Sequence, residues 1–132
     1  MGEYTGRNMA DLDGIRDTIQ NYFDGLYDGD LERMRRAFHP CCHLYSVSEG
    51  SVQDESAPDW FQRIQNRPSP ASQGATRRDE IIFIDLNGTG SALAKVQVSA
   101  PSGRYSDYLS MLKLHEGWRI VAKVFASCDS GS

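Results

Sequence analysis

The sequence predicts an α+β fold in which N-terminal helices cover a curved antiparallel sheet. Apolar side chains in residues 15–38 recur at the three- and four-residue spacing typical of helices. In residues 79–127, β-branched and aromatic residues form runs cut by glycine, a pattern typical of strands. Helices followed by strands favour an α+β order over βαβ units. With 132 residues, 39% of them hydrophobic, we expect one domain around one core.

The first two helices are predicted from spacing and from capping residues. Residues 1–10 show no periodicity, so we expect a flexible tail, after which Asp11 or Asp13 caps the first helix. A break at residues 28–30 separates it from a second helix, which Asp30 caps and Pro40 ends. The apolar face of the first helix consists of Ile15, Ile19, Tyr22, Phe23, Leu26 and Tyr27. That of the second helix consists of Leu31, Met34, Ala37 and Phe38.

A short strand and a third helix follow. Residues 43–47 predict the strand, and residues 48–57, which are small and acidic, predict a loop. Pro58 suits the first turn of a helix that extends to Ile64. Prolines and a glycine indicate that residues 67–75 are a loop leading to the remaining strands.

The C-terminal part predicts a meander of four antiparallel strands. The strands cover residues 79–86, 90–100, 103–115 and 118–127. Turn signals stand at Asn87-Gly88 and Glu116-Gly117. Such short turns join neighbouring antiparallel strands. The domain therefore spans residues 11–127, and residues 128–132 form a C-terminal tail.

Alternation along these strands predicts which side chains share a face. One face of the second strand carries Ala92, Ala94, Val96 and Val98. In the last strand, Ile120, Ala122 and Val124 oppose Arg119, Val121, Lys123 and Phe125. Since both faces carry apolar groups, we expect helices to cover one face and a second subunit to cover part of the other.

Charge and hydropathy exclude several classes of partner. A net charge of −4 disfavours nucleic acid, whose binding requires a basic surface, and Arg33, Arg35 and Arg36 are interpreted as a solvated helix face. No apolar run is long enough to cross a bilayer, and the N-terminus lacks the apolar core of a secretory signal. We therefore expect a cytoplasmic protein with no membrane partner.

The cysteine pattern argues against disulfides and against a metal site. Cys41, Cys42 and Cys128 are an odd number, and neighbouring cysteines are poorly placed to bridge each other. Reduced thiols agree with a cytosolic location. Cys41, Cys42 and His43 are consecutive, so at most two of them could face one metal, and no second ligand pair follows. We expect no metal.

Two stretches of sequence resemble the nuclear transport factor 2-like superfamily. Residues 22–40, YFDGLYDGDLERMRRAFHP, resemble the opening of its SnoaL-like and putative lumazine-binding families. Residues 105–114, followed by Gly-Trp-Arg-Ile-Val at 117–121 and Lys-Val-Phe at 123–125, resemble the closing hairpin of the lumazine-binding group. The resemblance implies a cone-shaped α+β barrel, a pocket at its open end and a homodimer joined through the sheets.

The resemblance also implies the type of chemistry to look for. Cyclases and isomerases of this fold use a carboxylate or a histidine as general base, with hydrogen-bond donors that stabilise an enolate. We therefore select Asp107, His43 and Tyr45 as candidate catalytic residues. Asp107 interrupts an apolar run, where desolvation would raise the pKa of a carboxyl group. The structural alternative is an ion pair of Asp107 with Lys95 or Lys123.

Further residues are candidates for ligand binding. They are aromatic or basic side chains of the predicted helices and strands: Tyr22, Tyr27, Phe38, His39, Trp60, Phe61, Lys95 and Lys123. Phenols can donate hydrogen bonds, a histidine beside the pocket mouth can relay protons, and Trp60 with Phe61 can form a lid. The structural alternatives are core packing for the aromatic residues, a helix-end hydrogen bond for His39, and solvated ion pairs for the lysines.

The function that these observations favour is binding of a small organic ligand in a largely apolar pocket, without a tightly bound cofactor. The chain has no nucleophile elbow, phosphate-binding loop or metalloprotease motif. One alternative is an enzyme of the isomerase, cyclase or dehydratase type that uses a pocket Asp or His as general base. Another is a protein-binding adaptor.

Overall fold

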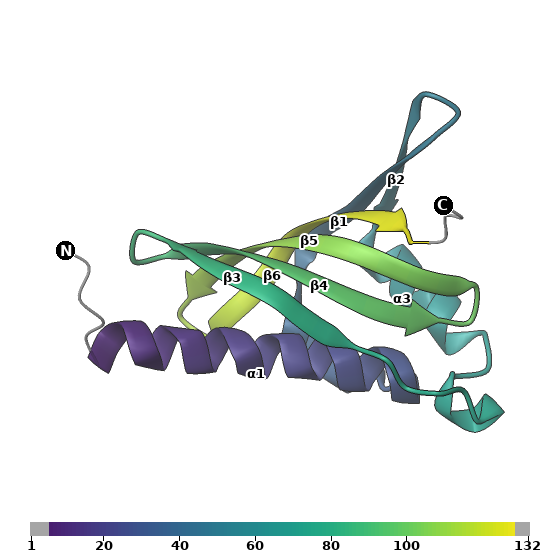
Figure 1. Cartoon of the computed structure of the whole chain (residues 1–132), viewed down its shortest axis with the longest axis horizontal. Coiled ribbons are helices and arrows are strands. Elements are labelled where there is room, and N and C mark those ends of the chain that lie inside the picture. Colours follow the sequence, from purple (N-terminus) through teal and green to yellow (C-terminus); the bar gives the residue numbers. More distant parts are fainter. Residues whose placement is uncertain (1–5, 129–132) are drawn as a thin grey trace.

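Three helices pack on a six-stranded mixed sheet in the computed structural model, which describes residues 6–128 (Figure 1). The helices are α1 (Gly6–Asp28), α2 (Leu31–Ala37) and α3 (Ala57–Gln65), with a 3₁₀ turn at Ala71–Gln73. The strands are β1 (Phe38–Ser48), β2 (Ser51–Ser56), β3 (Glu80–Asn87), β4 (Ser91–Ala100), β5 (Gly103–Leu114) and β6 (Gly117–Ser127). Their order is β2-β1-β6-β5-β4-β3, and only the β1–β6 pair is parallel. The predicted α+β class with a mainly antiparallel sheet is confirmed.

The long helix α1 lies along one face of the sheet and begins earlier than the sequence predicts (Figure 1). Residues 6–10 of the expected tail belong to this helix, whereas residues 1–5 and 129–132 of the two expected tails lie outside the described residues. Asp11 does not cap α1. Its side chain is buried on the inner side, one turn before Ile15, and accepts a hydrogen bond from Lys113 Nζ at 2.8 Å. This contact with β5 adds one helical turn to the face of α1 that packs on the sheet, and the spacing of the apolar residues does not predict that turn.

The second helix is capped as predicted but ends sooner. Asp30 Oδ1 accepts hydrogen bonds from the backbone N–H of Glu32 and Arg33, which confirms Asp30 as the N-cap. The expectation that Pro40 ends the helix is wrong, because β1 already begins at Phe38. Residues 39–42 lie opposite a single residue of β6, so Pro40 occupies an irregular part of the strand where no regular ladder bond is required.

Residues 48–57, predicted to be a loop, contain the strand β2. Glu49 and Gly50, both with positive φ, form a two-residue turn between the paired Ser48 and Ser51, and this geometry matches the twist of a hairpin. Most side chains of β2 are exposed, so no alternating apolar pattern marks the strand. Its hydrogen bonds to β1 hold it in place. The β1–β2 hairpin extends beyond the rest of the sheet (Figure 1).

The predictions of the third helix and of the four-stranded meander are confirmed. Ser56 Oγ caps α3, Pro58 stands in its first turn, and the helix buries Trp60, Phe61 and Ile64. The four predicted C-terminal strands are β3, β4, β5 and β6, which are neighbours in the sheet. The turns lie at residues 88–90, 101–102 and 115–116, and the first and last of them lie within a residue or two of the two predicted turn signals.

The prediction that Ala92, Ala94, Val96 and Val98 share a face is confirmed, since all four are buried. The prediction for β6 fails on the N-terminal side of Val121. On β5, the successive residues Ser110 and Met111 pair with Ala122 and Ile120, which leaves Val121 as the extra residue of a β-bulge. The bulge shifts the alternation, so Ile120 and Lys123 both turn to the inner face instead of opposing each other.

The outer face of the sheet carries a row of half-exposed apolar side chains. Register places Tyr45 beside Val124, Val124 beside Tyr108, Tyr108 beside Lys95, and Lys95 beside Phe83. Tyr108 is 44% exposed and Val124 is 51% exposed. This row crosses five adjacent strands.

Within residues 6–128, no helix has the length and hydropathy needed to cross a membrane.

Close packing of α1 against β6 yields a prediction about Gly14. A Cβ at this position would lie 2.9 Å from Trp118 Cδ1, and the ring is buried. Gly14→Ala should lower the free energy of unfolding by about 1–3 kcal/mol from overpacking, although alanine favours a helix by about 1 kcal/mol. Urea denaturation measures the change. Gly90→Ala is the control, because nothing lies within 4 Å of that Cβ. Equal stability of both variants would contradict the close contact.

Candidate functional site

A cavity of about 210 Å³ lies between α1, α3 and the inner face of the sheet. Its walls are mostly apolar and aromatic, with basic groups at both ends. The residues that line it are Tyr22, Leu26, Leu44, Trp60, Arg63, Arg67, Val98, Ala100, Ser102, Tyr105, Lys123 and Phe125. Lys123, Tyr22 and Trp60 are buried and form the inner end, whereas Arg63 and Ser102 are exposed and mark the mouth.

Three polar side chains are joined by hydrogen bonds at the inner end of the cavity. Lys123 Nζ donates to Tyr22 Oη at 2.9 Å, and Tyr22 Oη donates to Asp107 Oδ2 at 2.6 Å. Lys123 Nζ is also 3.7 Å from Asp107 Oδ2. The three side chains come from β6, α1 and β5, so the packing of α1 on the sheet assembles the cluster.

The carboxylate of Asp107 is fully buried and only half satisfied. Its exposed fraction is 0%, and Oδ1 has no hydrogen-bond partner among the described residues. Leaving a buried acceptor unpaired costs about 1–3 kcal/mol, and more for a charged group. The charge of Asp107 is therefore compensated mainly by Lys123 and by the phenol of Tyr22.

Aromatic rings enclose the amine of Lys123. Its Nζ lies 4.2 Å from the ring centroid of Trp60, 5.0 Å from that of Tyr22 and 5.1 Å from that of Phe125, within the range of cation–π attraction. Burial lowers the pKa of Lys123, and the charge of Asp107 opposes this shift only in part. The amine therefore loses its proton more readily than an exposed lysine does.

Tyr22 remains protonated under ordinary conditions. Burial raises its pKa well above the usual value, and the charge of Asp107 and the hydrogen bond to it act in the same direction. The nearby thiol of Cys42 behaves similarly, because burial raises its pKa to about 12 while the charge of Lys123 opposes the shift. Tyr22 thus connects Lys123 and Asp107 as a neutral phenol, which can accept a proton from one while donating its own to the other.

Two arginines lie at the outer end of the cavity. Arg63 Nε and Nη2 both donate to the carboxylate of Glu55, at 2.6 and 2.7 Å, and this contact raises the pKa of Arg63. The guanidinium of Arg67 has no hydrogen bond or ion pair with a described side chain. Burial lowers the pKa of Arg67, and repulsion from Arg63 adds to this effect. An anionic group at the mouth would supply the partner that Arg67 lacks.

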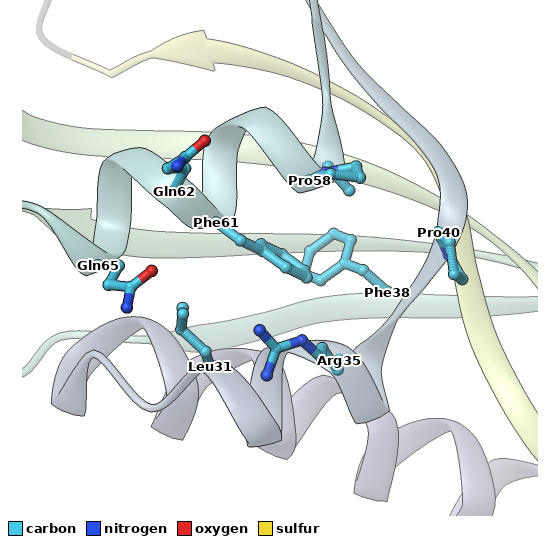
Figure 2. Close-up of a pocket in the computed structure, with 9 residues that line it drawn as sticks. Leu31, Arg35, Phe38, Pro40, Pro58, Phe61, Gln62 and Gln65 are labelled. Carbon is cyan, nitrogen blue, oxygen red and sulfur yellow. The ribbon is translucent and has the colours of Figure 1, made fainter.

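A larger hollow of about 330 Å³ lies elsewhere, between α2, α3 and the start of β1. Figure 2 shows the rings of Phe38 and Phe61 side by side in it, with Arg35 reaching from α2 and Gln62 and Gln65 from α3. Arg35 is its one charged lining residue, and its lining includes no buried polar group. We assign the candidate site to the smaller cavity, because only that cavity has buried titratable groups in its wall.

Four of the predicted site residues lie together. Asp107, Tyr22 and Lys123 form the buried cluster, and the ring of Trp60 covers the lysine. The ion pair of Asp107 with Lys123, considered from the sequence as a structural alternative, is present. The structural alternative considered for the lysines was a solvated ion pair, whereas this pair is buried.

The structure does not bring His43 and Tyr45 to this cluster. Both alternate with the buried Cys42 and Leu44 along β1, so they face the opposite side of the sheet. Their rings stack there, and His43 Nδ1 lies 2.6 Å from Asp54 Oδ1. Of the three candidate catalytic residues, only Asp107 therefore lies at the cavity, because the period of two along β1 turns His43 and Tyr45 to the other face of the sheet.

The other predicted ligand residues lie outside the cavity. Tyr27 Oη donates to the carbonyl of Ala75 at 2.7 Å, and His39 Nδ1 accepts from the backbone N–H of Cys41. Lys95 is on the outer face, with Nζ 5.3 Å from the Tyr108 ring centroid. Phe38 and Phe61 line the hollow of Figure 2.

Several lining residues were missed from the sequence. Tyr105 shares a strand face with Asp107 by the period of two, and this signal could have identified it. Arg63 follows Trp60 at helical spacing within α3, which places it near the same opening. Phe125 was predicted to share a face with Lys123, but the bulge at Val121, which turns this face inward together with Ile120, is not visible in the sequence.

The buried cluster predicts a specific pattern of stabilities. Asp107→Leu leaves the cation of Lys123 and the phenol of Tyr22 without their acceptor, so it should cost about 3–5 kcal/mol. Adding Lys123→Met should recover at least half of that loss, since no buried charge then remains unpaired. Chemical denaturation of the two variants measures both values.

The control is Arg36→Ala, which breaks the exposed Arg36–Glu32 pair and should cost less than about 1 kcal/mol. A loss for Asp107→Leu no greater than that of the control would contradict a buried ion pair.

Comparison with known proteins identifies the family. A curated relative, the aldolase FrzH of Cladobotryum sp., is 24% identical over 119 residues, covering 89% of this chain and 92% of that protein. A solved NTF2-like protein of unknown function from Shewanella baltica has a TM-score of 0.79 at 23% identity, covering 92% of this chain and 97% of the other. Another, from Methylobacillus flagellatus, has a TM-score of 0.71 at 27% identity, covering 88% and 90%. The family model described as putative lumazine-binding matches residues 10–126. The chain belongs to this family and has the cone-shaped α+β fold of the NTF2-like superfamily.

Proposed function

We propose that this protein binds a small organic anion with a carbonyl group in the cavity between α1, α3 and the sheet. The observation that carries the proposal is the buried amine of Lys123 at the inner end of a mostly apolar cavity. Specific ligand sites combine apolar walls with a few convergent polar groups, and this cavity has that composition. The family description as lumazine-binding supports a small-molecule ligand.

The size and charge of the cavity narrow the ligand class. About 210 Å³ is below the range of about 300–1,000 Å³ typical of sites for drug-sized molecules, so the ligand is smaller. Rings of Trp60, Tyr105 and Phe125 suit an aromatic or aliphatic body. Arg67 suits a carboxylate at the mouth, and Lys123 suits an oxygen or a carbonyl carbon at the inner end.

A second candidate function is catalysis of bond making or breaking next to that carbonyl. The hydrogen-bonded chain from Lys123 through Tyr22 to Asp107 favours it, because such a chain moves protons between a bound molecule and a buried carboxylate. Asp107 serves as the terminal base, in agreement with the isomerase, cyclase or dehydratase alternative considered from the sequence. His43 is not required. The similarity to a protein named an aldolase supports the same reaction class.

The ligand proposal is tested with 2-naphthoate as an anionic probe and 2-naphthalenemethanol as its neutral counterpart. Both should shift the indole resonance of Trp60 in an NMR titration, with Trp118→Phe used to assign the two tryptophans. Arg67→Gln should weaken 2-naphthoate about ten-fold, since a charge-assisted hydrogen bond contributes about 1.5 kcal/mol. The neutral probe should bind equally well to both proteins.

Arg35→Gln is the matched control, because Arg35 lines the hollow of Figure 2 instead of the cavity. It should leave both probes unaffected. A probe that responds to Arg35→Gln and not to Arg67→Gln occupies the other hollow, and that result would reject the proposal.

The row of apolar side chains on the outer face supports a homodimer joined through the sheet. Tyr108 and Val124 lie at its centre, flanked by Tyr45 and Phe83, and Lys95 lies among them. These side chains are half exposed in the single chain. A second copy that packs on the same row would remove them from water, and a stable interface of this kind buries more than about 1,200 Å².

Sedimentation at micromolar concentration should therefore give twice the mass of one chain. Val124→Lys should shift the equilibrium to monomer, because it places a charge between Tyr45 and Tyr108 in the row that the interface would bury. Val52→Lys is a matched control on β2, away from the row, and should leave the dimer intact. A monomeric unmodified protein at high concentration would refute this arrangement.

A further inference from the structure

We propose that Lys123 forms an imine with the carbonyl carbon of the ligand bound in the cavity. The inference rests on the proposed function, in which the cavity holds a small carbonyl compound, and it assigns a covalent role to one residue. The chain has three lysines, at positions 95, 113 and 123. Lys95 lies on the outer face, and the amine of Lys113 donates a hydrogen bond to Asp11. Of the three lysines, Lys123 alone lines this cavity.

The surroundings of Lys123 suit a nucleophilic amine. Its Nζ is enclosed by the rings of Tyr22, Trp60 and Phe125, which exclude water from the side of the amine that they cover. A lysine desolvated in an apolar site is activated as a nucleophile toward carbonyl groups, because the neutral amine becomes easier to form. An imine held in such a site is also protected from hydrolysis.

The hydrogen-bonded chain provides a way to form the neutral amine. The ammonium of Lys123 passes a proton to Tyr22 Oη while Tyr22 passes its own to Asp107 Oδ2, along contacts of 2.9 and 2.6 Å. An ion pair thereby becomes a neutral amine and a neutral carboxylic acid. The total charge of the cluster is unchanged, so no charge must enter or leave the buried site.

The covalent step balances without a cofactor. The nitrogen lone pair of Lys123 attacks the carbonyl carbon, a C–N bond forms, and the carbonyl oxygen takes a proton from the Asp107 acid through Tyr22. In the resulting carbinolamine, the nitrogen gives up a proton, which reaches the hydroxyl group through the same residues. The protonated hydroxyl group then leaves as water. Overall, the lysine ammonium and the carbonyl compound give an iminium ion and one water molecule, with one positive charge on each side.

An iminium at this position determines the subsequent chemistry. It withdraws electrons from the neighbouring carbon, whose C–H bond is then broken by a base to give an enamine. Asp107, reached through Tyr22, is the base within this cluster. The enamine carbon can attack a second carbonyl, and the reverse sequence cleaves the same bond. The structure thus links a buried lysine to aldol-type reactions of small carbonyl acids.

The test uses 4-carboxybenzaldehyde as the probe and sodium borohydride to reduce any imine to a stable secondary amine. Intact-protein mass spectrometry should show one added carboxybenzyl group at pH 7, and peptide mapping should place it on Lys123. Labelling of Lys95 and Lys113 should be at least about ten-fold lower, because neither of them lines the cavity that would hold the probe. Lys123→Met should abolish the single addition, whereas Lys95→Met should retain it.

Tyr22→Phe separates a nucleophilic from a merely structural lysine. This variant keeps the ring and removes the relay, so labelling of Lys123 should slow at pH 7 and recover at higher pH, where the amine loses its proton to water. Even labelling of the three lysines would overturn the imine. A shift of the Trp60 indole by the probe without an adduct at Lys123 would overturn the imine and leave the binding proposal standing. Absence of both signals would overturn the two together.

Discussion

The ion pair of Asp107 with Lys123, bridged by Tyr22, is the constraint on which the site depends. Each of these groups would be costly to bury alone, and together they connect α1 to β5 and β6. The same three residues stabilise the inner end of the fold and form the buried hydrogen-bonded chain at that end of the cavity. The same contacts therefore stabilise the fold and serve the proposed chemistry, as is common where groups with strongly shifted pKa values line a pocket.

A β-bulge makes this cluster possible. With regular alternation, β6 would place Ile120 and Lys123 on opposite faces, and the lysine would point to solvent. The extra residue Val121 turns both inward and increases the local twist of the sheet. The parallel neighbour β1 is irregular at the same point, since residues 39–42 lie opposite Val121. One local departure from the ladder thus curves the sheet and delivers the amine to the concave face.

The site was predicted in part, and the errors have identifiable causes. Asp107 was recognised because a carboxylate in an apolar run is a conspicuous exception, and Tyr22 because it lies on the apolar face of a strong helix. His43 and Tyr45 were selected as candidates from the fold resemblance, but they alternate with buried neighbours and face outward. Arg67 was missed, since an arginine after a helix has no pattern that distinguishes it from a solvated one.

The sequence by itself determined the elements that depend on local physics. The spacing of apolar residues predicted α1 and α3, and Asp30 predicted the start of α2. Glycine turns and alternation predicted the meander and the residues of β4 that share its inner face. Tertiary structure decided what depends on partners. The strand β2 exists because β1 offers it hydrogen bonds, and Lys123 faces the cavity because a bulge shifts its register. Such features arise from pairing between strands, which the order of residues within one strand does not encode.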